Sequence, residues 1–195
     1  PVILGVRALA TPLACGNAVV FKASEICPRT HGLIVEALDE GGLPAGLVSL
    51  VTNAPEDAGE IVGALVDHPA VRRINFTGST KVGRIIAERA ARQLKPVLLE
   101  LGGKAPFLVL RDADLDEAVK AAIFGAFFNQ GQICMSTERI ILAPEIADDF
   151  VARFTARAAA LKAGDPRDGK APLGAVVDAH TAVSYTHLTL PTSDL

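Results

Sequence analysis

The stretch RRINFTGSTKVGRIIAERAA, residues 72–91, has the pattern of a strand, a glycine turn and a helix. Arg72–Phe76 is predicted to be a strand, and Ser79–Ala91 has the apolar spacing of an amphipathic helix. The turn places Gly78 and Ser79 at the start of that helix, where free N–H groups and the helix dipole attract phosphate. The Ser79 hydroxyl can donate to a phosphate oxygen, or it can simply cap the helix, which is the commoner role at a helix start. The turn is therefore a candidate phosphate site with a structural alternative.

Strands and helices alternate in the same way on both sides of this stretch. Strands are predicted at 18–22 (AVVFK), 47–52 (LVSLVT), 72–76 and 96–101 (PVLLEL). Helices are predicted from Pro28 to the glycines at 41 and 42, over 56–66 and over 79–91. The strands are almost continuously apolar, which is typical of parallel strands buried on both faces. This alternation predicts an α/β fold with a parallel sheet covered by helices.

A second unit begins after Gly102, Gly103 and Lys104, which break the pattern. The elements predicted there are a strand at 106–110, a helix over 115–127, a loop over 129–136, a strand at 138–143 and a helix over 145–162. The first of these helices has the clearest apolar stripe in the chain. Asp114 and Glu117 at its start have the spacing of an acidic capping box.

The two ends of the chain differ from its middle. The apolar stretch at 1–21 is interrupted by Arg7, Pro12, Gly16 and Asn17. It is therefore neither a membrane span nor a signal peptide, which would also need a basic start. Because the chain begins at Pro1 rather than at Met, we expect an internal fragment of a longer protein. The stretch SYTHLTLPTSDL, residues 184–195, has no Ala and holds the only Tyr, so we expect a non-native tail.

Composition excludes several classes of protein. Half of the 195 residues are hydrophobic and 21% are charged, which supports a packed core and excludes a disordered chain. The net charge of −3, without a long basic run, argues against a nucleic-acid or anionic-membrane partner. Cys15, Cys27 and Cys134 are too few and too far apart for a disulfide scaffold, and the lack of C-x-x-C spacing argues against a cysteine zinc site. We expect no metal and a reducing cytoplasm.

Lys22, Ser24 and Glu25 lie at the carboxyl end of the strand at 18–22. Ligands of open α/β sheets bind at those ends. The Glu25 carboxylate can accept hydrogen bonds from both hydroxyls of a ribose. It would repel a 2′-phosphate by its charge, which favours NAD over NADP. A lysine and a glutamate on a solvated turn are the alternative interpretation.

Glu100 and Cys134 are the candidates for acid–base and nucleophilic chemistry. Glu100 is flanked by leucines at a strand end, where burial would raise its pKa and suit a general base. A structural ion pair with Lys104 is the alternative. Cys134 follows the polar loop sequence NQGQI, where a partly exposed thiolate is a good nucleophile. A buried, inert cysteine is the alternative there.

The histidines share no local motif with Cys134. His31 is expected on the surface of a helix, and His68 in a turn before Pro69. A Cys-His hydrolase is therefore poorly supported by the spacing.

Several segments together resemble the aldehyde dehydrogenase superfamily. They are CGNAVVFKASE (15–25), GGLPAGLVSLVT (41–52), FTGSTKVG (76–83), LELGGK (99–104) and FFNQGQIC (127–134). The resemblance extends from Pro1 to about Ala182. It implies an α/β, incomplete aldehyde dehydrogenase fold, in which a Rossmann-like parallel-sheet cofactor domain (1–101) is joined to an α/β catalytic domain (102–183). The tail at 184–195 lies outside it.

The resemblance also implies roles for single residues. Cys134 matches the nucleophile, which forms a thiohemiacetal and then a thioester with the aldehyde. Glu100 matches the base that activates water for hydrolysis. The implied cofactor-binding residues are Lys22, Ser24, Glu25, Phe76, Thr77, Gly78, Ser79, Val82, Gly83 and Leu101. Among them, Glu25 matches a ribose contact, Ser79 a pyrophosphate contact, and Leu101 a residue whose carbonyl lies near the nicotinamide.

The closer resemblance is to bacterial aromatic aldehyde dehydrogenases of the vanillin, salicylaldehyde and benzaldehyde type. The segments that carry it are PVILGVRALATPLACGN (1–17), KASEICPRTHGLI (22–34) and GQICMSTERII (131–141). It implies NAD-dependent oxidation of an aromatic aldehyde in the cytoplasm, by a homodimer or homotetramer when complete. The family's oxyanion-hole Asn and a downstream ribose-binding Glu fall outside this chain. A catalytically incomplete nucleotide-binding fragment and a thiol hydrolase using Cys134 are the alternatives.

Overall fold

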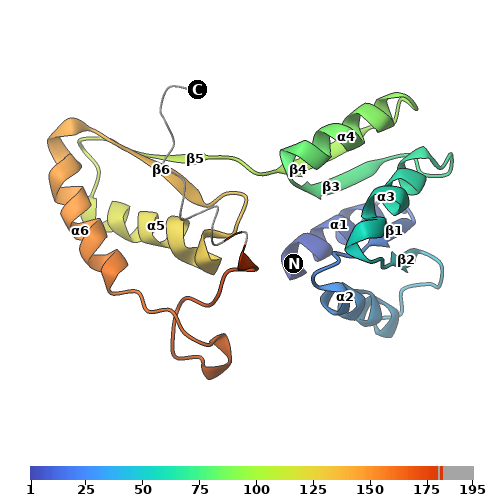
Figure 1. Cartoon of the computed structure of the whole chain (residues 1–195), viewed down its shortest axis with the longest axis horizontal. Helices are drawn as coiled ribbons and strands as arrows, with labels where there is room; N and C mark the ends of the chain where they lie inside the picture. Colours follow the sequence, from blue (N-terminus) through green and yellow to red (C-terminus); the bar gives the residue numbers. More distant parts are fainter. Residues whose placement is uncertain (180, 182–195) are drawn as a thin grey trace. The chain divides into compact units, whose positions relative to one another are not determined.

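A computed structural model describes residues 1–179 and 181 of the chain (Figure 1). The chain divides into two units, Pro1–Leu101 and Gly102–Leu195. Their assignment as a cofactor domain and a catalytic domain stays a prediction. The expected tail at 184–195 lies outside the described residues, as does His180.

The strands of the first unit form parallel pairs. β1 (Val19–Lys22) pairs with β2 (Val48–Val51), and β3 (Ile74–Gly78) pairs with β4 (Val97–Leu101). The predicted α/β fold with parallel strands is confirmed. Among the described residues, however, no ladder joins one pair to the other, so the expected single sheet is not formed. One helix connects the two strands of each pair, and within the described residues neither outer edge of a pair has a further strand beside it.

Helices cover these pairs. The helices of the first unit are α1 (Val2–Ala14), α2 (Pro28–Glu40), α3 (Ala58–Asp67), α4 (Thr80–Ala91) and the 3-10 helix η1 (Pro55–Asp57). α4 runs beside β3 and β4 (Figure 1) and packs against α3. Val66, Ile86 and Ala90 form the core between these elements. Within the part of the chain that is described, no helix is long and apolar enough to cross a membrane.

The end of one strand and the presence of one helix in the first unit differ from the prediction. β3 continues to Gly78 rather than ending at Phe76, because its last residue pairs with Leu101 of β4. The apolar stretch near the N-terminus, for which no helix was predicted, forms α1. That helix buries Gly5 and Leu9.

The second unit also has a parallel pair of strands covered by helices. Its strands β5 (Ala105–Val109) and β6 (Thr137–Leu142) are parallel. Its helices are α5 (Leu115–Phe127), α6 (Ala147–Ala159) and the 3-10 helices η2 (Phe128–Gly131), η3 (Pro144–Ile146) and η4 (Pro166–Asp168). The core consists of Val109 from β5, Val119 and Ala122 from α5, and Phe150 from α6.

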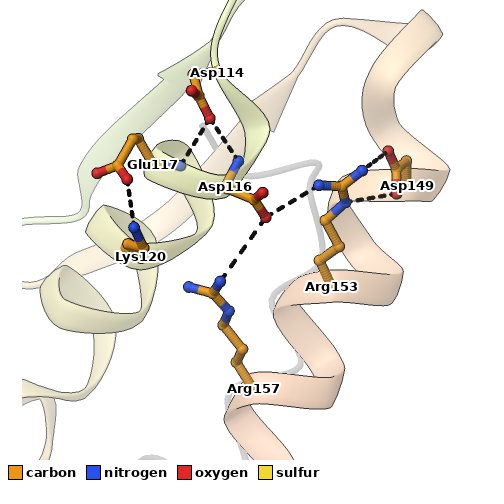
Figure 2. Close-up of polar contacts among 7 residues, drawn as sticks. All are labelled: Asp114, Asp116, Glu117, Lys120, Asp149, Arg153 and Arg157. Carbon is orange, nitrogen blue, oxygen red and sulfur yellow. Dashed lines mark hydrogen bonds and ion pairs between the residues drawn. The ribbon is translucent and has the colours of Figure 1, made fainter.

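Charged side chains connect the first turn of α5 to α6 (Figure 2). Asp114 caps α5 by accepting hydrogen bonds from the N–H groups of Asp116 at 2.9 Å and Glu117 at 3.1 Å. The Glu117 carboxylate bonds to Lys120 instead of returning to Asp114, so the reciprocal capping box is not formed. Arg153 of α6 bonds to Asp116 at 3.1 Å, which joins the two helices.

Candidate active site

The carboxyl ends of β1 and β2 bring Lys22, Glu25 and Asn53 together. Lys22 Nζ lies 2.6 Å from Glu25 Oε1, and Asn53 Nδ2 donates to the same oxygen at 3.2 Å. The Lys22 and Glu25 side chains are only 18% and 23% exposed, so they are not on a solvated turn. The hydrogen bond from Lys22 lowers the pKa of the Glu25 carboxyl, and burial opposes that effect. The carboxylate is therefore held ionised at this edge.

His31 supports the same loop from α2, and its predicted surface position is wrong. The residue is 8% exposed, and its Nδ1 accepts a hydrogen bond from the Ser24 N–H at 3.0 Å. Its ring packs against Phe21 with a centroid distance of 5.0 Å. Burial lowers the pKa of the imidazole, which favours the neutral form that can accept this bond.

Two signals in the sequence point to the residues that were missed. His31 precedes Ile34 by one helical turn and therefore lies on the apolar face of α2. Asn53 follows the strand β2 at its carboxyl end, as Ser24 and Glu25 follow β1.

The carboxyl ends of β3 and β4 bring a second group of predicted residues together. In the register of the pair, Thr77 lies beside Glu100 and Gly78 beside Leu101. Ser79 caps α4 by accepting a hydrogen bond from the Val82 N–H at 3.3 Å. The capped-turn interpretation is therefore correct, and it leaves the proposed phosphate contact untested.

Two glycines of the FTGSTKVG motif have a packing reason of their own. A Cβ on Gly83 would lie 2.7 Å from Leu101 Cδ2, and a Cβ on Gly78 would lie 2.5 Å from Phe76 Cζ. Glycine therefore allows α4 to approach β4 closely and allows the Phe76 ring to lie over the end of β3. These contacts place four of the predicted cofactor residues against one another.

Glu100 has a different ionic neighbour from the one the sequence suggested. Its side chain is 37% exposed, and Arg7 Nη2 of α1 lies 3.5 Å from Glu100 Oε1. Lys104, the alternative partner, instead bonds to Glu138. Within the first unit, Glu100 therefore lies next to a cation from the N-terminal helix.

Cys134 lies at an exposed turn in the second unit. The turn is closed by a hydrogen bond from the Ser136 N–H to the Ile133 carbonyl at 3.0 Å, with Cys134 and Met135 between them. The thiol is exposed, so the alternative of a buried cysteine is wrong. An exposed thiol can reach a substrate carbonyl.

The residues before this turn have an unusual backbone. Asn129, Gln130 and Gly131 have φ angles of 52°, 58° and 72°, a left-handed conformation that is costly for the first two. The segment is held by hydrogen bonds from Asn129 Nδ2 to the Gln132 carbonyl at 3.2 Å and from the Val177 N–H to Gln132 Oε1 at 2.8 Å. Backbone strain of this kind clusters at functional sites.

A cavity of about 410 Å³ adjoins the turn. It is lined by Ala126, Phe127, Gln130, Gly131, Ser136, Thr137, Glu138 and Val176. Ser136 is 4% exposed, and its hydroxyl oxygen has no hydrogen-bond partner among the described residues. The cavity therefore combines an aromatic wall with a buried hydroxyl. In the same described part of the chain, no cluster of three or more His, Cys, Asp or Glu side chains could hold a metal ion.

Comparison with known proteins places these features in a family. The model of the aldehyde dehydrogenase family matches residues 1–189. A vanillin dehydrogenase of Pseudomonas fluorescens is 62% identical over 179 residues, which cover 92% of this chain and 37% of the relative. A salicylaldehyde dehydrogenase of Pseudomonas putida is 57% identical over 164 residues, covering 84% of this chain and 34% of the relative. The chain thus spans little more than a third of the length of these curated relatives.

Solved structures agree. The crystal structure of a salicylaldehyde dehydrogenase from Pseudomonas putida G7, complexed with salicylaldehyde, matches with a TM-score of 0.82 and 56% identity, covering 84% of this chain and 34% of that one. The crystal structure of a succinate-semialdehyde dehydrogenase from Burkholderia pseudomallei matches with a TM-score of 0.89 and 34% identity, covering 94% of this chain and 37% of that one. The fold is therefore an incomplete aldehyde dehydrogenase fold, and the chain belongs to the aldehyde dehydrogenase family.

Proposed function

We propose that this chain is part of an NAD-dependent aldehyde dehydrogenase that oxidises an aromatic aldehyde to its carboxylic acid. The observation that carries the proposal is the exposed thiol of Cys134 on a hydrogen-bonded turn. A thiol in that position can add to a carbonyl carbon, which a buried cysteine cannot do. The identity of 62% to a vanillin dehydrogenase supports the aromatic class of substrate.

Cys134 begins the proposed reaction as a thiolate. Its sulfur adds to the aldehyde carbon to give the oxyanion of a thiohemiacetal, which becomes a thioester when that carbon gives up its hydride, for which bound NAD would be the acceptor. Glu100 then takes a proton from water as the water oxygen attacks the thioester, and the carboxylic acid leaves as the thiolate is restored. The backbone N–H of Cys134 would donate to the developing oxyanion, a contact worth about 10²–10³ in rate.

The first unit carries the residues that would hold NAD. When bound, NAD would accept the hydride. The buried amide oxygen of Asn53, without a partner among the described residues, supports a polar ligand beside Glu25. Glu25 would accept hydrogen bonds from the adenosine ribose, and its charge would disfavour the 2′-phosphate of NADP. The start of α4 at Ser79 would lie against the pyrophosphate, and the Leu101 carbonyl near the nicotinamide. From the resemblance alone, we also propose a homo-oligomer in the cytoplasm.

The test uses the complete protein that contains this chain, with NAD and a series of benzaldehyde, vanillin and salicylaldehyde. We expect one NADH for each carboxylate formed. Cys134→Ala should lower turnover by about a thousandfold or more, while calorimetry shows unchanged NAD binding. Cys15→Ala, which removes another exposed cysteine, is the matched control and should leave turnover unchanged.

Three results would contradict the proposal. Undiminished turnover in Cys134→Ala would exclude the nucleophile. Ester hydrolysis without NADH formation from any aldehyde would favour a thiol hydrolase. NAD binding without oxidation or ester hydrolysis would favour a nucleotide-binding module without catalysis.

A further inference from the structure

The Glu25 carboxylate is fixed through one of its two oxygens. Oε1 receives hydrogen bonds from Lys22 Nζ at 2.6 Å and from Asn53 Nδ2 at 3.2 Å. Lys22 Nζ also donates to the Ala23 carbonyl at 2.9 Å, so this ammonium is engaged within the loop. The arrangement leaves Oε2 as the oxygen with capacity to accept from a ligand.

The orientation of the Asn53 amide follows from its neighbours. Its Nδ2 donates to the Glu25 carboxylate and to the Ala54 carbonyl at 2.7 Å, both of which are acceptors. The amide oxygen is therefore directed elsewhere. It is buried and has no hydrogen-bond partner among the described residues. A buried acceptor of this kind is uncommon in a folded protein unless a ligand or a water supplies the donor.

The donors of this cluster, Lys22 Nζ and Asn53 Nδ2, are engaged within the loop, and the groups left to meet a ligand are acceptors. A ribose with free 2′- and 3′-hydroxyls brings two O–H donors, which match the Glu25 carboxylate and the Asn53 amide oxygen. A 2′-phosphate brings negative charge and acceptor oxygens to the same place. The chemistry of the cluster therefore favours an unphosphorylated ribose.

We propose that Asn53 is a positioning residue that holds Glu25 in the orientation that accepts the ribose diol, and thereby sets the preference for NAD over NADP. This inference rests on the proposed function. His31 also helps to position Glu25. It accepts a hydrogen bond from the Ser24 N–H at 3.0 Å, which fixes the backbone just before Glu25. Without the Asn53 amide, the Glu25 side chain can rotate away and admit a 2′-phosphate.

The experiment measures dissociation constants for NAD and NADP by calorimetry on the complete protein. Asn53→Ala should weaken NAD binding by about tenfold and lower the ratio of NAD to NADP affinity by a similar factor. In steady state it should raise the KM for NAD with little change in kcat, because Asn53 touches no reacting atom. Asn17→Ala is the matched control, since the Asn17 amide donates to the carbonyls of Pro12 and Cys15 rather than to Glu25.

A double-mutant cycle with Glu25→Ala separates positioning from a general structural effect. If Asn53 acts through Glu25, Asn53→Ala should change the affinity ratio little in the Glu25→Ala background. An unchanged ratio in Asn53→Ala alone, with NAD binding intact in the unaltered protein, overturns this inference and leaves the proposed function standing. An unaltered protein that binds neither dinucleotide overturns the proposed function and this inference with it.

Discussion

The strand ends of the first unit and the Cys134 turn of the second unit hold their polar residues in opposite ways. At the ends of β1 and β2, the Lys22 and Glu25 side chains are mostly buried and bonded to each other. At the Cys134 turn the thiol is exposed, and Asn129 and Gln130 adopt left-handed backbone angles. Groups that bind by charge and hydrogen bonds need fixed partners, whereas a nucleophile needs access to its substrate.

After the loss of the Cys134 thiol, the largest expected effect is at the end of β4. Glu100→Gln removes the proposed base but keeps the shape of the side chain, so the thioester should form and then persist. We expect a burst of NADH followed by steady-state turnover about 10²–10³ times slower, measured by stopped flow. The trapped acyl-enzyme should be visible by mass spectrometry. Glu117→Gln, at an exposed glutamate of α5, is the control. Linear NADH formation without a burst would assign Glu100 a structural role instead.

The next effect tests what supports the Cys134 turn. A Cβ on Gly125 of α5 would lie 2.5 Å from Thr137 Oγ1, at the start of the strand that follows the turn. Gly125→Val should therefore lower the free energy of unfolding by about 1–3 kcal/mol through overpacking. Denaturant titration measures the loss. Gly59→Ala, in α3 with open space around the new Cβ, should not destabilise the protein in this way. Adding Thr137→Ala should restore part of the lost stability, and no restoration would exclude this contact as the cause.

A smaller effect tests whether the backbone strain before the Cys134 turn has a catalytic role that the same strain elsewhere in the chain does not have. Gln130→Gly and Leu94→Gly each place glycine at a positive φ, 58° and 53° respectively. Each should stabilise the fold by up to about 1 kcal/mol, because glycine adopts this conformation without the side-chain clash. Only Gln130→Gly should also lower kcat, since it loosens the segment that leads to Cys134. Equal kcat values in the two variants would show that the strain has no catalytic role.

The smallest effect is the pH dependence of the strand-end cluster. The hydrogen bond from Lys22 lowers the pKa of Glu25 below its ordinary value of 4.5. Its contribution to stability is therefore fully present above pH 4.5 and is lost as the pH falls through the folded-state pKa. Glu25→Gln should cost less than about 1 kcal/mol at neutral pH, as a small ion pair does. Thermal unfolding across the acid range should show this difference shrinking, and a constant difference would exclude Glu25 as its source.

Local pattern was sufficient for most of the fold. The helices α2, α4 and α5 begin at or next to their predicted residues, because Pro28, Ser79 and Asp114 act through neighbours in the same turn. The helix α1 was missed because its stretch contains Pro12 and Gly5 and has exposed apolar residues on more than one face. The sequence also did not predict that the four strands of the first unit form two separate pairs. Strand pairing is decided between residues far apart in the chain.

The sequence alone also determined the candidate chemistry, because the segments around Glu25, Ser79, Glu100 and Cys134 are contiguous motifs whose residues can be matched one by one. Only the tertiary structure decided which partners surround those residues. It buried the His31 ring against the Ser24 N–H, placed Asn53 against Glu25, and paired Lys104 with Glu138. These contacts join residues from different elements, and their geometry depends on how helices and strands pack. A motif therefore identifies the reacting group, while packing determines how that group is held.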